Sequence, residues 1–266
     1  MSLSKGELYT FVTNKSGKCK QGTLVAVIKG TLSKDIASVL EKIPLYRREL
    51  VVEVTMDMAN NMESASRQAF PNAQIVTDRF HVVKLATEAL QHIRIKNRWD
   101  EIDKENEAIK TARKQNKKHK PIVLSNGDTP KQLLARCRLI LYKYENNWTD
   151  SQKIRMELLC NLYPEIKVAY DKVIEFRNIF ENKDRNKAKE AIEKWIKETE
   201  TLKNDKFNTV CNTVKSNMEN ILNFFNNRNT NANAESFNAK VKLFRANLRG
   251  VIDTKFFLFR ITKLLA

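Results

Sequence analysis

Two short apolar runs in the first third of the chain flank a segment with helical spacing. They cover 51–56 and 74–77, are rich in Val and Ile, and are followed by Asp57 and Asp78 respectively. Such runs are typical of buried strands, and 60–70, which a proline follows, is predicted as a helix between them. This order predicts a right-handed crossover in a parallel sheet. The two aspartates are therefore expected at the carboxyl ends of neighbouring strands, where α/β sheets bind ligands and metals.

The residues before this crossover predict a hairpin and a helix. Apolar residues dominate 7–13 and 23–28, and Gly17 and Gly22 lie between these two runs. Two strands joined by a turn would give this pattern. Ser33 is the expected N-cap of a following helix that ends at about residue 43. The whole N-terminal part is therefore predicted to be a mixed α/β structure.

The middle of the chain has apolar residues at intervals of three and four instead of two. This spacing predicts helices over 78–98, 99–116, 131–144, 151–162, 165–180, 187–199 and 205–225. The segment 110–120, which overlaps the end of one of these helices, carries six Lys and Arg and no acidic residue. Phosphate binding is open for it, with a disordered loop as the favoured alternative, and 121–130 is expected to be a loop. Core packing is expected for Phe80, Trp99, Trp148 and Trp195.

A polar stretch at 229–250 predicts the start of another helix. Asn231 and Asn233 can cap it, and Glu235 falls in its first turn. The helix is expected to continue to Gly250 and to carry the basic residues Lys240, Lys242, Arg245 and Arg249. The apolar segment 251–266 is predicted as a terminal helix that packs on the sheet.

The net charge of the chain points to a polyanionic partner. Its 266 residues include 48 Lys and Arg against 31 Asp and Glu, a formal net charge of +17. Nucleic acid is the default partner for such a surface, although Lys on ordinary solvated faces would give the same composition. No apolar run reaches the roughly 18 residues of a membrane span. The four cysteines show no spacing typical of a zinc site.

Three motifs give the chain a specific resemblance. TMDMA at 55–59, TDRFHVVK at 77–84 and TNANAESFN at 230–238 occur in this order, with a Lys/Arg-rich tail. Together they resemble the DDE domain of bacterial insertion-sequence transposases of the ISL-three family, over nearly the whole chain. The resemblance implies an RNase H-like mixed sheet with flanking helices, interrupted by a large all-helical insertion. The implied parts are 1–98 and 223–266 for the core and 99–222 for the insertion.

The resemblance also implies an activity and its partners. The family cuts DNA at transposon ends and transfers the 3′ hydroxyl into target DNA, with two Mg²⁺ or Mn²⁺ ions in the intact enzyme. Asp57 and Glu235 would be the catalytic carboxylates that hold metal. A strand-end helix cap for Asp57 and a dipole-favoured first-turn residue for Glu235 are the structural alternatives. The expected partners are double-stranded DNA and further copies of the chain, in the bacterial cytoplasm and nucleoid, without a membrane.

Further polar residues are expected near this site. By resemblance Asp78, Arg79 and His81 lie beside it, with Asp78 as an auxiliary acid and His81 as a phosphate contact. A hydrogen-bonded strand-to-helix junction is an equal alternative for these residues. Asn233 and Asn238 flank Glu235 and could orient it or touch DNA. Phosphate binding and simple solvation are both open for the four basic residues of the helix, Lys240, Lys242, Arg245 and Arg249.

The first aspartate of the family has no counterpart in the sequence. In the family it lies just upstream of a segment like SLSKGELYTFV, so its position would precede Met1. Glu7 and Asp35 do not match its place in the pattern. The chain is therefore expected to be shortened at its start and inactive as given. A non-catalytic DNA-binding transposase remnant and an RNase H-like nuclease are the alternative functions.

Overall fold

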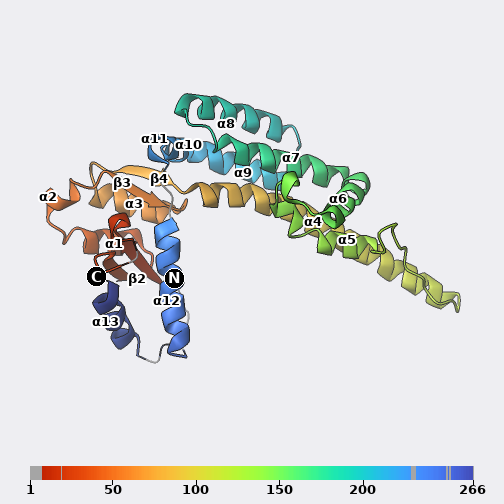
Figure 1. Cartoon of the computed structure of the whole chain (residues 1–266), viewed down its shortest axis with the longest axis horizontal. Coiled ribbons are helices and arrows are strands. Elements are labelled where there is room, and N and C mark those ends of the chain that lie inside the picture. The colour runs from red at the N-terminus through yellow and green to blue at the C-terminus, as the bar shows by residue number, and fades with distance from the viewer. Residues whose placement is uncertain (1–7, 19, 229–231, 250, 252, 266) are drawn as a thin grey trace. The chain divides into compact units, whose positions relative to one another are not determined.

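The computed structural model describes residues 8–18, 20–228, 232–249, 251 and 253–265. It divides into two compact units, one made of 1–81 and 217–266 and the other of 82–216. The first unit combines helices with two small sheets, and the second is helical (Figure 1). The mixed α/β class predicted from the sequence is therefore confirmed.

The first unit begins with an antiparallel hairpin of β1 (Tyr9–Thr13) and β2 (Leu24–Lys29). The connection contains a short 3-10 helix, η1 (Lys15–Gly17). Gly17 lies so close to the following chain that an added Cβ would stand 2.6 Å from the Cα of Thr23. Only glycine fits that approach, which explains why the sequence has a glycine in the predicted turn.

A β-bulge in β2 shifts the alternation of the strand's side chains at one position. Val12 pairs with Ala26, but Thr13 pairs with Leu24, so Val25 is an extra residue in β2. Because side chains alternate along a strand, this one residue moves Leu24 to the face opposite Ala26. Leu24 belongs to one apolar cluster and Ala26 packs against another. The hairpin therefore supports a hydrophobic layer on each side.

The predicted crossover follows the hairpin. It consists of β3 (Glu53–Met56), α3 (Asn60–Ala69) and β4 (Gln74–Thr77). The strands pair in parallel, from Glu53 with Gln74 to Met56 with Thr77. The strand–helix–strand prediction is confirmed.

Two helices connect the hairpin to β3, α1 (Ser33–Leu40) and α2 (Leu45–Arg48). The predicted N-cap role of Ser33 is wrong, because Leu32 occupies the cap position and no side chain accepts a hydrogen bond there. Asp35 lies in the first turn of α1, where the helix dipole favours a negative charge. The helix itself begins where the sequence predicted.

Helices α1 and α3 form one layer that covers both sheets. Leu40 of α1 and Ala65 of α3 are fully buried in a cluster with Ile28 of β2, and Val12 of β1 and Val54 of β3 pack against it. Among the described strands the two sheets, β1–β2 and β3–β4, are not hydrogen-bonded to each other. The continuous RNase H-like sheet implied by the resemblance therefore stays a prediction.

The opposite face of the hairpin is covered by α12 (Ala232–Asn247) and α13 (Thr254–Leu265). Phe237 of α12 and Phe257 of α13 are buried in one cluster with Tyr9 of β1. The rings of Phe237 and Phe11 lie 5.7 Å apart. The prediction that the terminal segment packs on the sheet is confirmed.

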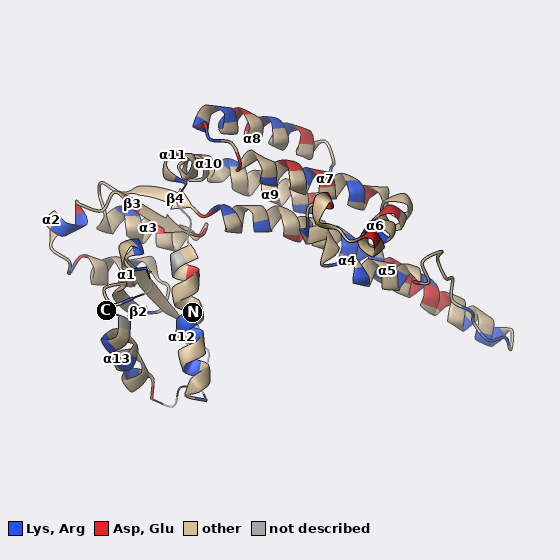
Figure 2. Cartoon of the chain, in the orientation of Figure 1, with Lys and Arg blue, Asp and Glu red and all other residues tan. Residues whose placement is uncertain are grey.

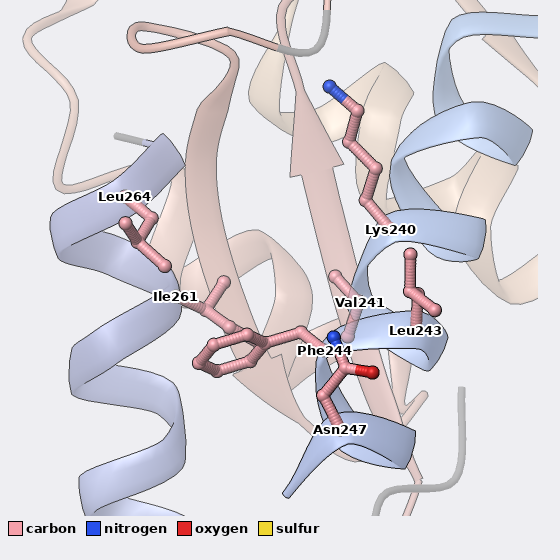
Figure 3. Close-up of a pocket in the computed structure, with 7 residues that line it drawn as sticks. All are labelled: Lys240, Val241, Leu243, Phe244, Asn247, Ile261 and Leu264. Atoms are coloured by element: carbon pink, nitrogen blue, oxygen red, sulfur yellow. The ribbon is translucent and has the colours of Figure 1, made fainter.

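An apolar pocket lies between these two helices. Val241 and Phe244 of α12 meet Ile261 and Leu264 of α13 around it (Figure 3). Apolar residues of this cluster recur along α12 at 237, 241 and 244, the spacing of one helix face. This face fixes the rotation of α12 and so decides which side chains point away from the core.

The second unit is built from helices: α4 (Arg79–Lys114), α5 (Pro130–Arg136), η2 (Ile140–Tyr142), η3 (Glu145–Asn147), α6 (Asp150–Leu162), α7 (Pro164–Ile179), α8 (Arg185–Glu200) and α9 (Asp205–Ser216). α4 is continuous where the sequence predicted two stretches. Trp195 is buried against Phe176, with ring centroids 4.2 Å apart. The core prediction is wrong for Trp99, which is 60% exposed.

The predicted helix 205–225 is interrupted in the structure. α9 ends at Ser216, and α10 (Met218–Leu222) and α11 (Phe224–Asn227) follow in the first unit. Asn217 leaves the helical conformation, with φ −109° and ψ 17°. Asparagine often breaks helices in this way because its side chain competes for backbone hydrogen bonds.

Candidate metal centre

The two strand-end aspartates emerge at the same edge of the parallel sheet. The backbone N–H of Asp78 donates to the oxygen of Met56 at 2.9 Å, which extends the ladder beyond the last strand pair. Asp57 and Asp78 therefore follow adjacent strands, as the sequence predicted. Their surroundings differ, because Asp57 is exposed whereas Asp78 is 2% exposed.

Asp78 is fixed at the start of α4. Its Oδ1 accepts a hydrogen bond from the backbone N–H of Phe80 at 3.2 Å, and its backbone oxygen accepts one from His81 N–H at 3.1 Å. The N-terminus of a helix also favours a negative charge at this position. The junction considered from the sequence is thus present, and it holds the carboxylate beside the first turn of α4. Phe80 is 57% exposed, so its predicted core position is wrong.

Hydrogen bonds join the segment before α12 to the first residues of β3 and β4. The Asn223 side chain donates to the Ile75 backbone oxygen at 2.8 Å and accepts from Gln74 Nε2 at 2.9 Å. Asn227 Nδ2 donates to Glu53 Oε2 at 3.3 Å. These contacts tie the residues before α12 to β3 and β4. Sequence analysis did not find them, because asparagines are abundant here and their spacing carries no distinctive pattern.

Glu235, in the first turn of α12, completes a cluster with two residues of the β4–α4 junction. One ligand atom from each of Asp78, His81 and Glu235 lies within 4.8 Å of the other two. His81 Nε2 stands 3.8 Å from Glu235 Oε1. The His81 side chain is 29% exposed and that of Glu235 is 47% exposed, so solvent reaches the group. A carboxylate–imidazole–carboxylate set of this kind can bind a divalent cation.

The other predicted residues are not members of this cluster. Asp57 stands outside the group of mutually close ligand atoms. Its role with Glu235 stays a prediction. The Arg79 guanidinium lies 5.8 Å from the centroid of the Phe224 ring, in a cation–π contact. Asn238 is half-buried on α12, while Asn231 and the side chain of Asn233 lie outside the described residues.

An ion pair that was not predicted joins the hairpin to β3. Lys15 Nζ lies 2.6 Å from Glu53 Oε1 and also contacts the hydroxyl of Thr55. The Glu53 side chain is 8% exposed, and Thr55 Oγ1 donates to it at 2.9 Å. With Asn227 as a further donor, Glu53 serves to hold three segments together.

One side of α12 carries polar and charged residues in line with Glu235. Asn238, Lys242 and Arg245 follow it at intervals of three and four, so they lie along one side of the helix, next to the buried face. Figure 2 shows Lys and Arg along both α12 and α13. We call the set Glu235, Asn238, Lys242 and Arg245 the α12 polar stripe.

The remaining two basic residues of the predicted set lie elsewhere. Lys240 lies off the polar stripe and lines the pocket between α12 and α13 (Figure 3). Arg249 follows the end of α12, with φ +55°. The four basic residues therefore do not form a single face.

A comparison with protein families is decisive for the class of protein. The family model described as a transposase, for DDE enzymes of the ISL-three group, matches residues 1–261. The chain belongs to this transposase family. No curated protein and no solved structure gives a match. In the described part of this transposase, no helix is both long enough and apolar enough to cross a bilayer.

Family membership confirms the resemblance read from the three motifs. DDE transposases act on DNA and generally use divalent metal. The donor set of this transposase fits such an ion, because Asp78, His81 and Glu235 offer two carboxylates and one imidazole within a small space. The cluster and the exposed Asp57 are the groups that could hold metal.

Proposed function

We propose that this transposase carries metal ligands for a reaction that cuts DNA at insertion-sequence ends and joins the 3′ hydroxyl to target DNA with Mg²⁺ or Mn²⁺. We also propose that the chain has little activity of its own, since the family's first aspartate has no counterpart among its residues. The observation that supports the metal ligands is the return of Glu235 to the carboxyl edge of the parallel sheet, beside Asp78. Asp57 ends the neighbouring strand at that edge. Asp57, Asp78 and Glu235 would together serve this edge.

Each group has a distinct part in this proposal. Asp57 and Glu235 are the ligands for catalytic metal, which would activate the attacking oxygen and stabilise the leaving one. Both are accessible to a DNA backbone, since Asp57 is exposed and the Glu235 side chain is 47% exposed. Asp78 would add negative charge at the edge of the site.

The α12 polar stripe would bind the DNA backbone. Lys242 and Arg245 follow Glu235 along one helix face, so phosphates bound there would lead the duplex toward the carboxylates. Contacts to phosphate position DNA without reading its sequence. The net charge of +17 favours the same partner. The active assembly is proposed to contain several copies of the chain on transposon-end and target DNA.

Cleavage of insertion-sequence end DNA in the presence of Mg²⁺ tests the reaction. Asp57→Asn and Glu235→Gln should each abolish any residual cleavage and any Mg²⁺ or Mn²⁺ binding, since each removes a proposed metal ligand. Asp35→Asn is the matched control, because Asp35 is an exposed aspartate of α1. If the Asp57→Asn variant cleaved DNA as fast as the wild type, the ligand assignment would be wrong.

The two alternative functions give different results in the same assays. A non-catalytic DNA-binding remnant would bind duplex DNA in a salt-dependent manner without Mg²⁺-dependent cleavage. An RNase H-like nuclease would cut RNA–DNA hybrids and show no preference for transposon ends.

A further inference from the structure

The donor atoms of Asp78, His81 and Glu235 are nearly spaced for one coordination shell. Ligand atoms about 2.0–2.2 Å from a shared cation stand about 3–4 Å from one another. The three atoms here lie within 4.8 Å, and His81 Nε2 is 3.8 Å from Glu235 Oε1. Side-chain movements of about 1 Å would therefore close the shell, without movement of the backbone.

The cluster has one rigid member and two adjustable ones. Asp78 is 2% exposed and is held by the N–H of Phe80. His81 and Glu235 are partly exposed, at 29% and 47% of their side chains. A fixed carboxylate with two solvent-accessible donors would allow a cation to enter from solvent and draw the donors together.

Burial of Asp78 favours an opposite charge beside it. A carboxylate that loses its hydration is stable only when hydrogen bonds or a cation compensate for it. The N–H of Phe80 contributes one hydrogen bond to Oδ1. A divalent ion shared with Glu235 would compensate both carboxylates at once.

The imidazole decides which cation fits best. Mg²⁺ prefers oxygen ligands, whereas imidazole suits first-row transition metals. We propose that Asp78, His81 and Glu235 form a site for one transition-metal cation, such as Mn²⁺, Co²⁺ or Zn²⁺, in preference to Mg²⁺. The site shares Glu235 with the proposed catalytic pair but does not include Asp57. It follows from the geometry of the cluster and does not depend on strand transfer.

Metal binding by the whole chain tests the site directly. Co²⁺ is titrated into the protein and followed by its visible absorption, and Mg²⁺ is then added as a competitor. The wild type should bind one Co²⁺ that excess Mg²⁺ displaces poorly. His81→Asn replaces nitrogen with an oxygen donor of similar reach and should weaken Co²⁺ binding at least about tenfold, with a smaller effect on Mg²⁺.

Control variants separate this site from the proposed catalytic pair. Asp57→Asn should leave Co²⁺ binding unchanged, and Glu235→Gln should weaken it. Far-UV circular dichroism checks that each variant is folded, and His92→Asn is the matched histidine control because His92 is exposed on the same helix. A wild type that binds no Co²⁺ would overturn the inference. Co²⁺ binding that is unchanged by His81→Asn but lost with Asp57→Asn would also overturn it. That result would still be consistent with Asp57 and Glu235 as the proposed catalytic pair.

Discussion

The side-chain amide of Asn223 donates a hydrogen bond to the backbone oxygen of Ile75, 2.8 Å away. Ile75 lies in β4, and Asn223 lies between the short helices α10 and α11, so this contact joins residues 148 positions apart. The amide also accepts a bond from Gln74. A free strand edge would otherwise be open to pairing with another chain. The same contact holds the chain close to β4 before it reaches Glu235.

Asn223→Ala should destabilise the first unit. It removes both hydrogen bonds of the amide and leaves a partly buried backbone oxygen without its donor, which costs about 1–3 kcal/mol. Urea unfolding measures the free-energy change. Asn226→Ala is the control, because Asn226 makes an exposed bond to Gln74 at 3.2 Å, and it should change stability by at most about 0.5 kcal/mol. Equal effects of the two substitutions would contradict the role given to Asn223.

The packing of α12 gives a second prediction. Phe237 is fully buried against the hairpin, so Phe237→Ala should lower the free energy of unfolding by about 3–5 kcal/mol. Leu243 lies on the same helix and is 63% exposed. Leu243→Ala should therefore cost at most about 0.5 kcal/mol. Chemical unfolding followed by circular dichroism compares them, and a large effect at Leu243 would mean that a partner covers it.

The thiols of the second unit should be unreactive in the folded protein. Burial raises the pKa of Cys137 from 9.0 to about 12 and that of Cys211 to about 11. Because the thiolate is the nucleophile, alkylation at pH 8 should be about 1,000-fold and about 100-fold slower than in the unfolded chain. Peptide mass spectrometry measures the rate of alkylation at each cysteine. Rates equal to those in urea would show that the helices open readily.

The raised pKa values of these thiols predict how the stability of the folded protein changes with pH. The folded protein keeps these groups protonated where the unfolded chain ionises, so the unfolded chain binds fewer protons between pH 9 and 12. Stability from this source is present below pH 9 and is lost as the pH rises through the raised pKa values. Urea unfolding at pH 8 and at pH 10.5 checks the direction, with Cys137→Ala as a variant that should weaken the dependence.

DNA binding should depend on which side of α12 a lysine occupies. Lys242→Ala removes a charge from the polar stripe, so affinity for duplex DNA should fall and the salt slope should decrease by about 1. Lys240→Ala is the matched control, because Lys240 lies off the stripe and lines the pocket. Titration at several salt concentrations gives both quantities. A larger effect for Lys240 would place the DNA on the other side of the helix.

Local patterns predicted the elements but not all of their contacts. The apolar run before Asp78 and the proline after residue 70 give β4 and α3 almost to the residue. Side-chain exposure was harder to predict, as Phe80 and Trp99 show. An aromatic residue in a helix does not by itself indicate which side of the helix packs against the core. The break at Asn217 was missed because the apolar spacing continues across it.

The metal cluster illustrates the same limit at long range. The motifs placed His81 near the site, but only as a possible phosphate contact. Its approach to Glu235 depends on the path of the intervening helices and on the contacts of Asn223 and Asn227. No periodicity in the sequence encodes a distance between residues 81 and 235. The motifs therefore named candidate residues, while the fold decided which of them meet.

The extra residue Val25 in β2 lies outside the alternation of side chains that the rest of the strand follows. Because the bulge accommodates it, Leu24 joins Val27 on the side of α12 and α13, while Ala26 and Ile28 face α1 and α3. Deleting Val25 would place Leu24 directly before Ala26 in a regular ladder and leave it on the same side. The exposed Val25 should therefore tolerate deletion as well as substitution.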